Sequence, residues 1–170
     1  KLYAHILNRR LMRYTEEHKL RNPAQAGNRP KLSTTHQLFT LQHLIDKAHS
    51  RANPRPLYVG ILDIASAFNT AQHPLIWKRL QCIGVHGRML KAIQSLYEGY
   101  SMRIHVDGRV GNSVPVSVGV KQGCPLSPQL FGLLVDALRI HLENTAAGAG
   151  VQLEHQWFVT DLDYVDDTLL

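Results

Sequence analysis

Three aspartates stand where segments expected to be β-strands end. Asp63 follows the apolar run 57–62, and Asp166 and Asp167 are adjacent in the stretch YVDD. Adjacent carboxylates repel each other and aspartate is disfavoured in strands, so the pair at 166–167 indicates a turn with a particular role. If the two strands pair in one sheet, the carboxylates of Asp63 and Asp166 converge although they are far apart in the sequence.

Converging carboxylates suit Mg²⁺, which binds one or two of them, keeps several waters, and takes further ligands from substrate phosphates. Two such ions about 4 Å apart stabilise an in-line phosphoryl displacement. The positive charge would also compensate the repulsion between Asp166 and Asp167. The residues alone leave a second interpretation open, in which an Asp–Asp turn and an unrelated strand-end aspartate share no function.

The elements that must position these acids are helices and short strands. Apolar residues at helical spacing predict five helices: residues 1–17, one from about Thr34, one from Pro74 to about Ile83, one from Gly87 to about Glu98, and one capped at Ser127. The run 57–62 predicts a buried strand. The pair Asp107–Gly108 predicts a hairpin turn, and a last hairpin is expected to turn near Val165–Asp166.

Composition describes a basic chain of one domain. The 170 residues are 44% hydrophobic and carry a net charge of +6. Residues 1–31 hold eight lysines and arginines and only two acids, a pattern that favours either a phosphate-binding surface or a solvated helix face. Cys82 and Cys124 lack CxxC spacing and are expected to be reduced thiols. No apolar run is long enough to span a membrane.

The motifs together resemble a known family. LDIASAFNT, GVKQGCPLSPQLF and YVDD, in this order and at this spacing, resemble the palm motifs of reverse transcriptases. KLYAHILNRRL followed by PAQAGNRPKLSTTHQLFTL resembles the fingers of the non-LTR (LINE-type) retrotransposon branch, so that the resemblance covers residues 1–170.

The resemblance implies an α/β (α+β) fold: a right-hand polymerase palm with partial fingers, an antiparallel sheet packed on helices, and no thumb. Residues 1–56 are expected to be partial fingers and residues 57–170 the palm, truncated just after the YVDD hairpin; together they would form one reverse transcriptase domain fragment. The fragment alone is expected to be inactive in polymerisation.

The resemblance also implies roles for individual residues. Asp63, Asp166 and Asp167 match the catalytic acids and, with the carbonyl of Ile64, would hold the metal. The residues expected to bind the dNTP are Ala65, Ser66, Ala67, Phe68, Gln122 and Gly123. Phe68 matches the aromatic side chain that collides with a ribose 2′-OH, which implies a deoxynucleotide substrate. Arg29 and Pro30 would contact the template or its phosphates.

The activity implied is RNA-directed DNA polymerisation with two Mg²⁺ ions, Mn²⁺ being a substitute. The expected partners are an RNA template, a DNA primer, dNTPs, the missing fingers and thumb segments of a parent polyprotein, and an endonuclease. A membrane is not among them, and the expected location is the nucleus or cytoplasm. Two alternatives remain: a decayed, catalytically dead domain that binds nucleic acid, and a group II intron maturase.

The chain departs from the family's usual pattern at several positions: Asn28 for an aromatic residue, Ser66 for lysine, Asn69 for aspartate, Asp163 for a small residue, and the retroviral-type Val165. The substitution at Asp163 is expected either to bury a costly carboxylate or to disturb the charge balance of the metal site. None of these departures replaces one of the three aspartates of the expected site.

Overall fold

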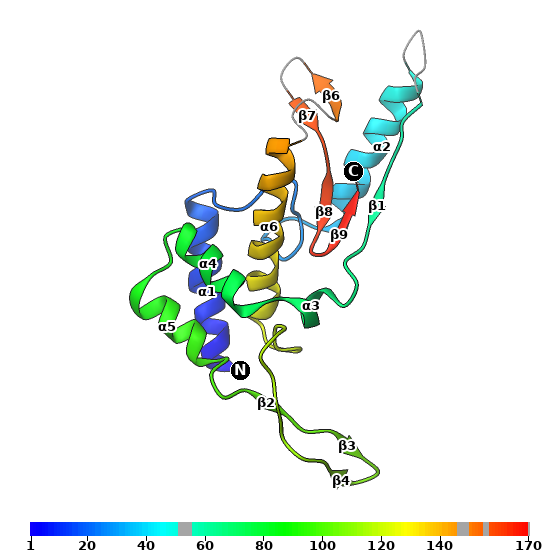
Figure 1. Cartoon of the computed structure of the whole chain (residues 1–170). Coiled ribbons are helices and arrows are strands. Elements are labelled where there is room, and N and C mark those ends of the chain that lie inside the picture. The colour runs from blue at the N-terminus through cyan, green and yellow to red at the C-terminus, as the bar shows by residue number, and fades with distance from the viewer. Residues whose placement is uncertain (51–55, 146–149, 155–156, 170) are drawn as a thin grey trace. The chain divides into compact units, whose positions relative to one another are not determined.

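The computed structural model describes residues 1–50, 56–145, 150–154 and 157–169. The chain divides into two compact units: unit 1 contains residues 1–13 and 66–134, and unit 2 contains residues 14–65 and 135–170 (Figure 1). Two of the three boundaries fall inside helices, α1 (Leu2–Glu17) and α6 (Ser127–Thr145), so each of these helices contributes residues to both units. The third boundary lies between Ala65 and Ser66.

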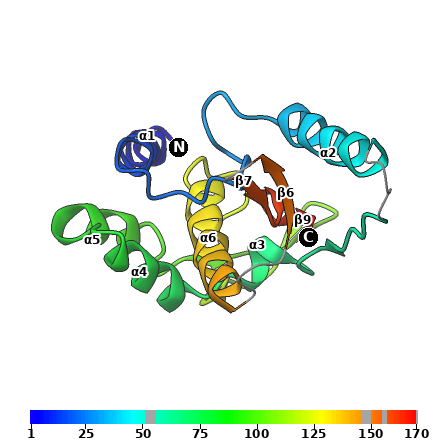
Figure 2. The same ribbon diagram turned by 90° about the horizontal axis from the view of Figure 1, so that it is seen from above.

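Unit 1 contains the short helix α3 (Ala67–Thr70) and the paired helices α4 (His73–Cys82) and α5 (Gly87–Ser95). Helices α4 and α5 lie side by side (Figure 2) and bury an apolar stripe of Ile76, Leu80, Leu90 and Ile93. Arg79 Nε donates to the carbonyl of Leu133 at 3.1 Å, which ties α4 to the first turns of α6. The expected helices are therefore confirmed to within a few residues at their ends.

A two-stranded ribbon extends from the helices of unit 1 (Figure 1). Strand β2 (Ser101–Met102) pairs with β5 (Val114–Pro115), and β3 (His105–Val106) pairs with β4 (Arg109–Val110). Asp107 and Gly108 connect β3 to β4 with φ values of 47° and 73°, as a primed hairpin turn requires. The hairpin predicted from Asp107–Gly108 is confirmed.

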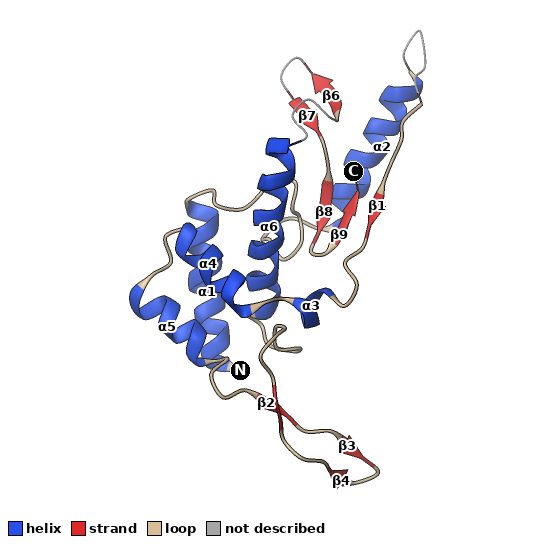
Figure 3. Ribbon diagram, in the orientation of Figure 1, coloured by secondary structure: helices blue, strands red, loops and turns tan. Residues whose placement is uncertain are grey.

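Unit 2 is built on a three-stranded antiparallel sheet with the order β1 (Ile61–Leu62), β9 (Asp167–Leu169) and β8 (Leu162–Tyr164). Strand β6 (Val151–Glu154) pairs separately with β7 (Trp157–Val159), and helix α2 spans Thr34–His49. Figure 3 shows how short these strands are relative to the loops. The mixture of helices and antiparallel sheet agrees with the expected α/β class.

Three local predictions are corrected. The segment 57–62 is not a buried strand, because only Ile61–Leu62 are paired and Tyr58, Ile61 and Leu62 are exposed; β1 lies at the edge of the sheet and is bonded on one side only. The Thr-x-x-Gln pattern of Thr34 and Gln37 predicts a capping box at Thr34, but the box that caps helix α2 lies one residue earlier and is formed by Ser33 and His36. The Ser127 hydroxyl donates to the carbonyl of Lys121 at 2.7 Å instead of capping α6.

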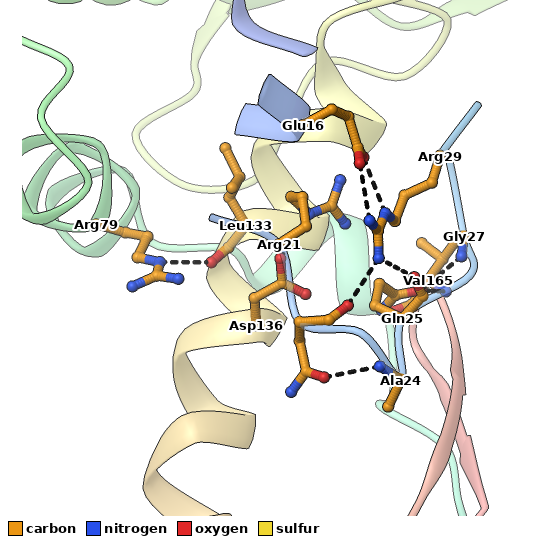
Figure 4. A network of polar contacts seen from close by, with 11 residues as sticks. Glu16, Arg21, Ala24, Gln25, Gly27, Arg29, Arg79, Leu133, Asp136 and Val165 are labelled. Atoms are coloured by element: carbon orange, nitrogen blue, oxygen red, sulfur yellow. Dashed lines mark hydrogen bonds and ion pairs between the residues drawn. The ribbon is translucent and has the colours of Figure 1, made fainter. Parts of the chain in front are cut away.

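Unit 2 contains a fully buried ion pair. Arg21 Nε lies 2.5 Å from Asp136 Oδ2, and both side chains are 0% exposed. Figure 4 shows Arg21 beside Asp136, which belongs to α6. Two charges without access to water are stable only as a pair, since removal of either one leaves the other uncompensated.

Among the described helices, none is both long and apolar enough to cross a membrane.

Asp136→Asn is expected to lower the free energy of unfolding by about 3–5 kcal/mol, because it breaks a buried ion pair by removing the charge of one partner. The double replacement Arg21→Met/Asp136→Leu removes both charges and should recover most of that loss. Urea unfolding of the three proteins measures the difference. Equal stability of Asp136→Asn and the original chain would show that the pair is not a stabilising contact.

Candidate active site

The turn between β8 and β9 holds two of the three candidate acids. Tyr164 pairs with Asp167, so Val165 and Asp166 form a two-residue hairpin loop. Val165 has a φ of 63°, which matches the primed turns of such hairpins but is strained for a β-branched side chain. Asp166 is half-buried and Asp167 is exposed. The expected turn near Val165–Asp166 is confirmed.

Strand pairing brings Asp63 to the same end of this sheet. Leu62 pairs with Thr168 in the antiparallel β1–β9 ladder, so the next residue, Asp63, lies opposite Asp167. The two acid-bearing strands therefore share one sheet, which is the condition for the convergence of Asp63 and Asp166. Within the described ranges, no three His, Cys, Asp or Glu residues are close enough together to form a metal cluster on their own.

The donor chemistry of this strand end fits Mg²⁺. Asp63, Asp166 and Asp167 offer carboxylate oxygens only, which are the hard ligands that Mg²⁺ prefers, and two of them face water. Because Mg²⁺ retains waters and binds substrate phosphates, a pair of carboxylates is sufficient on the protein side. The half-buried Ile64, whose carbonyl is the fourth expected ligand, follows Asp63 directly.

A loop of unit 2 extends the sheet beside β8. The Ala26 N–H donates to the carbonyl of Asp163 at 2.9 Å, and the Asp163 N–H donates to the carbonyl of Ala24 at 3.1 Å. Gln37 Nε2 from α2 donates to the same two carbonyls, at 2.7 Å to Ala24 and 2.9 Å to Asp163. The hairpin that carries the acids is therefore bonded along both of its edges.

The side chain of Gln25 binds the turn itself and is fully buried. Gln25 Nε2 donates to the carbonyl of Val165 at 3.1 Å, while Gln25 Oε1 accepts from the Val165 N–H at 2.8 Å (Figure 4). The Gly27 N–H donates to the same oxygen at 2.8 Å. The sequence analysis missed Gln25, because one glutamine in a proline-rich loop carries no signal of a contact so distant in the chain.

Asp163 is buried, and a cation lies beside it. Arg139 Nε lies 3.3 Å from Asp163 Oδ2, and the same guanidinium forms an ion pair with Asp161. All three residues are less than 5% exposed. The unusual carboxylate at position 163 is thus placed against Arg139 on α6. Arg139 offsets part of the charge of the two buried acids, a contact that the sequence pattern does not predict.

The expected nucleotide-binding residues Ser66, Ala67, Phe68, Gln122 and Gly123 all belong to unit 1, whereas Ala65 ends a segment of unit 2. Two stretches of unit 1 bring the first five together. The Val120 N–H donates to the carbonyl of Phe68 at 2.7 Å, and Gln122 Nε2 donates to Asn69 Oδ1 at 3.3 Å. Phe68 and Gln122 therefore lie together, as residues that line one side of a nucleotide site must. The surface formed by residues 66–68 and 122–123 is called the nucleotide wall below.

The ring of Phe68 is held in place by stacking. It lies 4.9 Å from the ring of Phe131 in α6, with an interplanar angle of 22°. Phe131 is buried and Phe68 is half-buried, so one part of the Phe68 ring remains accessible. Close by, Gly119 allows tight backbone approach, since an added Cβ would lie 2.9 Å from the carbonyl oxygen of Asn69.

Lys121, next to Gln122, lies against aromatic rings that the sequence analysis did not single out. Its Nζ lies 3.9 Å from the ring centroid of Tyr100 and 5.7 Å from that of Tyr97, as in cation–π contacts. Burial raises the pKa of Tyr97 above its usual value, so this ring stays neutral under ordinary conditions. These contacts fix the orientation of the Lys121 side chain, which lies next to Gln122 in the sequence.

Arg29, the expected template contact, is engaged within unit 2. Its guanidinium forms two parallel bonds of 2.8 Å with the carboxylate of Glu16 and also donates to the carbonyls of Asn22 and Gln25 (Figure 4). Hydrogen bonding to Arg29 lowers the pKa of Glu16. A template phosphate would have to replace Glu16, so contact by Arg29 stays a prediction, as does contact by the exposed Pro30.

Paired acids at the end of an antiparallel sheet, as unit 2 holds them, are a feature of nucleotidyl-transferring polymerases. Comparison with known proteins identifies the class. The family described as "Reverse transcriptase (RNA-dependent DNA polymerase)" matches residues 1–170. The chain belongs to this family, and its relatives place it among the reverse transcriptase domains of non-LTR retrotransposons.

Three relatives are polyproteins of R2 elements. The chain is 33% identical over 81% of its length to the Pol polyprotein of a type-1 R2 element of Popillia japonica. It is 31% identical over 71% of its length to that of Nasonia vitripennis, and 36% identical over 53% to the type-2 element R2DM of Drosophila melanogaster. These matches span 22%, 11% and 8% of the relatives, so the chain corresponds to a minor part of each.

Replacing Arg139 and replacing Asp163 are expected to have unequal effects. Arg139→Met removes the cation beside the buried Asp161 and Asp163 and should cost about 3–5 kcal/mol of unfolding free energy. Asp163→Ala leaves one buried cation facing one buried anion and should cost roughly 1 kcal/mol or less. Urea unfolding of both variants tests the asymmetry, and equal losses would contradict it.

Proposed function

We propose that this chain is the palm, with part of the fingers, of an RNA-directed DNA polymerase that extends a primer with dNTPs on an RNA template. The pairing of β1 with β9, which aligns Asp63 with the YVDD turn, is the observation that carries the proposal. In this proposal residues 1–56 are fingers and residues 57–170 are palm. The family supplies the reaction in general terms, and the residue roles are our assignment.

Asp63 and Asp166 are the proposed ligands of two Mg²⁺ ions, with the carbonyl of Ile64 as a further ligand and Asp167 as a supporting acid. When bound, Mg²⁺ would lower the barrier of phosphoryl transfer by stabilising charge on the attacking and leaving oxygens. The carboxylates orient this site because β1 and β9 fix Asp63 and Asp167 in register, while the hairpin turn fixes Asp166.

The proposed nucleotide site uses the wall of unit 1. Backbone N–H groups of residues 65–67 would bind the triphosphate, Phe68 would exclude a ribose 2′-OH, and Gln122 and Gly123 would lie near the incoming base and sugar. The stacking of Phe68 on Phe131 supports the role of Phe68, because a ring that excludes a hydroxyl must not rotate away. Ser66, directly before α3, has a φ of 53°.

Charge is distributed unevenly between the two units. Unit 1 carries eleven of the nineteen lysines and arginines but only two of the thirteen acids, whereas unit 2 carries the candidate catalytic aspartates and an excess of acids. A cationic surface supports binding of template and primer phosphates, with an affinity that falls steeply as salt rises. We infer that unit 1 provides most of the electrostatic attraction for nucleic acid.

A domain that binds nucleic acid without catalysis is the second candidate, favoured by the departures at Asn28, Ser66, Asn69 and Asp163. Arg139 lies beside Asp163, however, and offsets part of the cost of burying this carboxylate. The relatives are R2 polyproteins, which supports the retrotransposon assignment over a group II intron maturase.

Asp166→Asn is expected to abolish primer extension because it removes a proposed metal ligand, while Asp107→Asn in the exposed β3–β4 turn should leave the rate unchanged. We would assay both in a chimera in which this chain replaces the matching segment of the Popillia japonica polyprotein, with RNA template, DNA primer, dNTPs and Mg²⁺. Extension at the original rate by Asp166→Asn would exclude the proposed site.

Phe68→Val is expected to raise the use of ribonucleotides relative to deoxynucleotides by roughly tenfold or more, since it removes the ring that would meet the 2′-OH. Phe39→Val, at an exposed position of α2, is the control and should not alter this ratio. Single-nucleotide addition of rNTP and dNTP by the chimera measures the ratio. An unchanged ratio in Phe68→Val would reject the assigned role.

A further inference from the structure

We infer that Gln25 is a positioning residue for the candidate catalytic carboxylates, acting through the backbone of Val165. This inference rests on the proposed function of Asp166 and goes beyond it by assigning a role to Gln25, which lies in the stretch PAQAGNRPKLSTTHQLFTL but received no role from the resemblance. The geometry consists of one side-chain amide that binds both backbone groups of a single residue, Val165, which directly precedes Asp166.

The conformation of Val165 requires external support. Its φ of 63° lies in the left-handed region, which β-branched residues avoid because Cβ and the branched methyl groups meet the backbone. Strain of this kind persists only where surrounding contacts over-determine the conformation. The two hydrogen bonds from Gln25, at 3.1 Å and 2.8 Å, satisfy the Val165 carbonyl and N–H only when these groups point toward the loop.

Burial makes these bonds specific. Gln25 is 0% exposed, so a rotated turn would cost the amide both of its bonds to Val165 with no water to replace them. The Oε1 atom also accepts from the Gly27 N–H at 2.8 Å, which fixes the amide orientation from the loop side. The backbone bonds between Ala24, Ala26 and Asp163 hold the loop against β8, so the amide is directed at the turn.

Gly27 shows how closely the loop contacts the turn. A Cβ added at Gly27 would lie 2.3 Å from the Val165 nitrogen and 2.5 Å from its Cγ2. No side chain is compatible with this approach, so glycine is required by space and not by a positive φ. Gln25 and Gly27 thus fix the position of Val165 together. Gln25 forms hydrogen bonds with its backbone, and Gly27, which has no side chain, leaves room for it.

The test replaces Gln25 by methionine in the chain itself, which keeps the side-chain volume and removes the hydrogen bonds. We expect amide hydrogen exchange at Val165, followed by NMR, to accelerate roughly tenfold. The affinity for Mn²⁺, measured by paramagnetic broadening of signals from residues 164–167, should fall several-fold. The control is Gln129→Met, which removes another buried glutamine from α6 in unit 1.

A double variant separates positioning from general stability. Glycine adopts a positive φ without strain, so Val165→Gly should make the turn less dependent on Gln25. The effect of Gln25→Met on Mn²⁺ affinity should therefore be smaller in the Val165→Gly background. Gly27→Ala, which displaces Val165 sterically, should weaken Mn²⁺ binding as Gln25→Met does and serves where Gln25→Met fails to fold.

Two results would overturn the inference: exchange at Val165 no faster than in Gln129→Met, or faster exchange with unaltered Mn²⁺ affinity. Failure of the proposed function has a different signature. If the original chain shows no Mn²⁺ broadening near Asp166, the metal site is wrong, while the exchange rates still decide whether Gln25 fixes the turn.

Discussion

The hairpin that carries Asp166 and Asp167 depends on backbone pairing with two segments that are distant in the chain. Strand β1 bonds to β9 on one edge, and the stretch Ala24–Ala26 bonds to β8 on the other. Neither partner is longer than a few residues, so the hairpin is held by few hydrogen bonds. The candidate metal site depends on this double pairing, because the pairing places Asp63 opposite Asp167 and fixes the conformation of the turn.

Buried charges are the second constraint on unit 2. Arg21 with Asp136, and Arg139 with Asp161 and Asp163, place ionised groups where desolvation is expensive. Asp136 and Arg139 both belong to α6, so this helix presents an acid to one loop and a base to the strand beneath the turn. Such pairs contribute less to net stability than to fixing one arrangement, because a displaced segment would leave an uncompensated charge.

Local patterns predicted much of this structure. Helical periodicity located α1, α2, α4, α5 and α6, and Asp107–Gly108 and YVDD located two hairpin turns, because these features depend on residues close in sequence. The run at 57–62 was misjudged because an apolar stretch does not reveal whether a strand lies at an edge. The contacts of Gln25 and Arg139 were not predictable, since each joins side chains whose proximity arises only after the sheet forms.

The structure accommodates the departures from the family pattern in different ways. Asn28 has a φ of 54°, a left-handed conformation that asparagine tolerates better than an aromatic residue, so this change suits the local backbone. Asp163 is buried beside Arg139, and this one cation also pairs with Asp161, so the added carboxylate is accommodated by a shared counter-ion. None of the departures replaces Asp63, Asp166 or Asp167, and the retention of these three acids is the condition that the proposed catalysis requires.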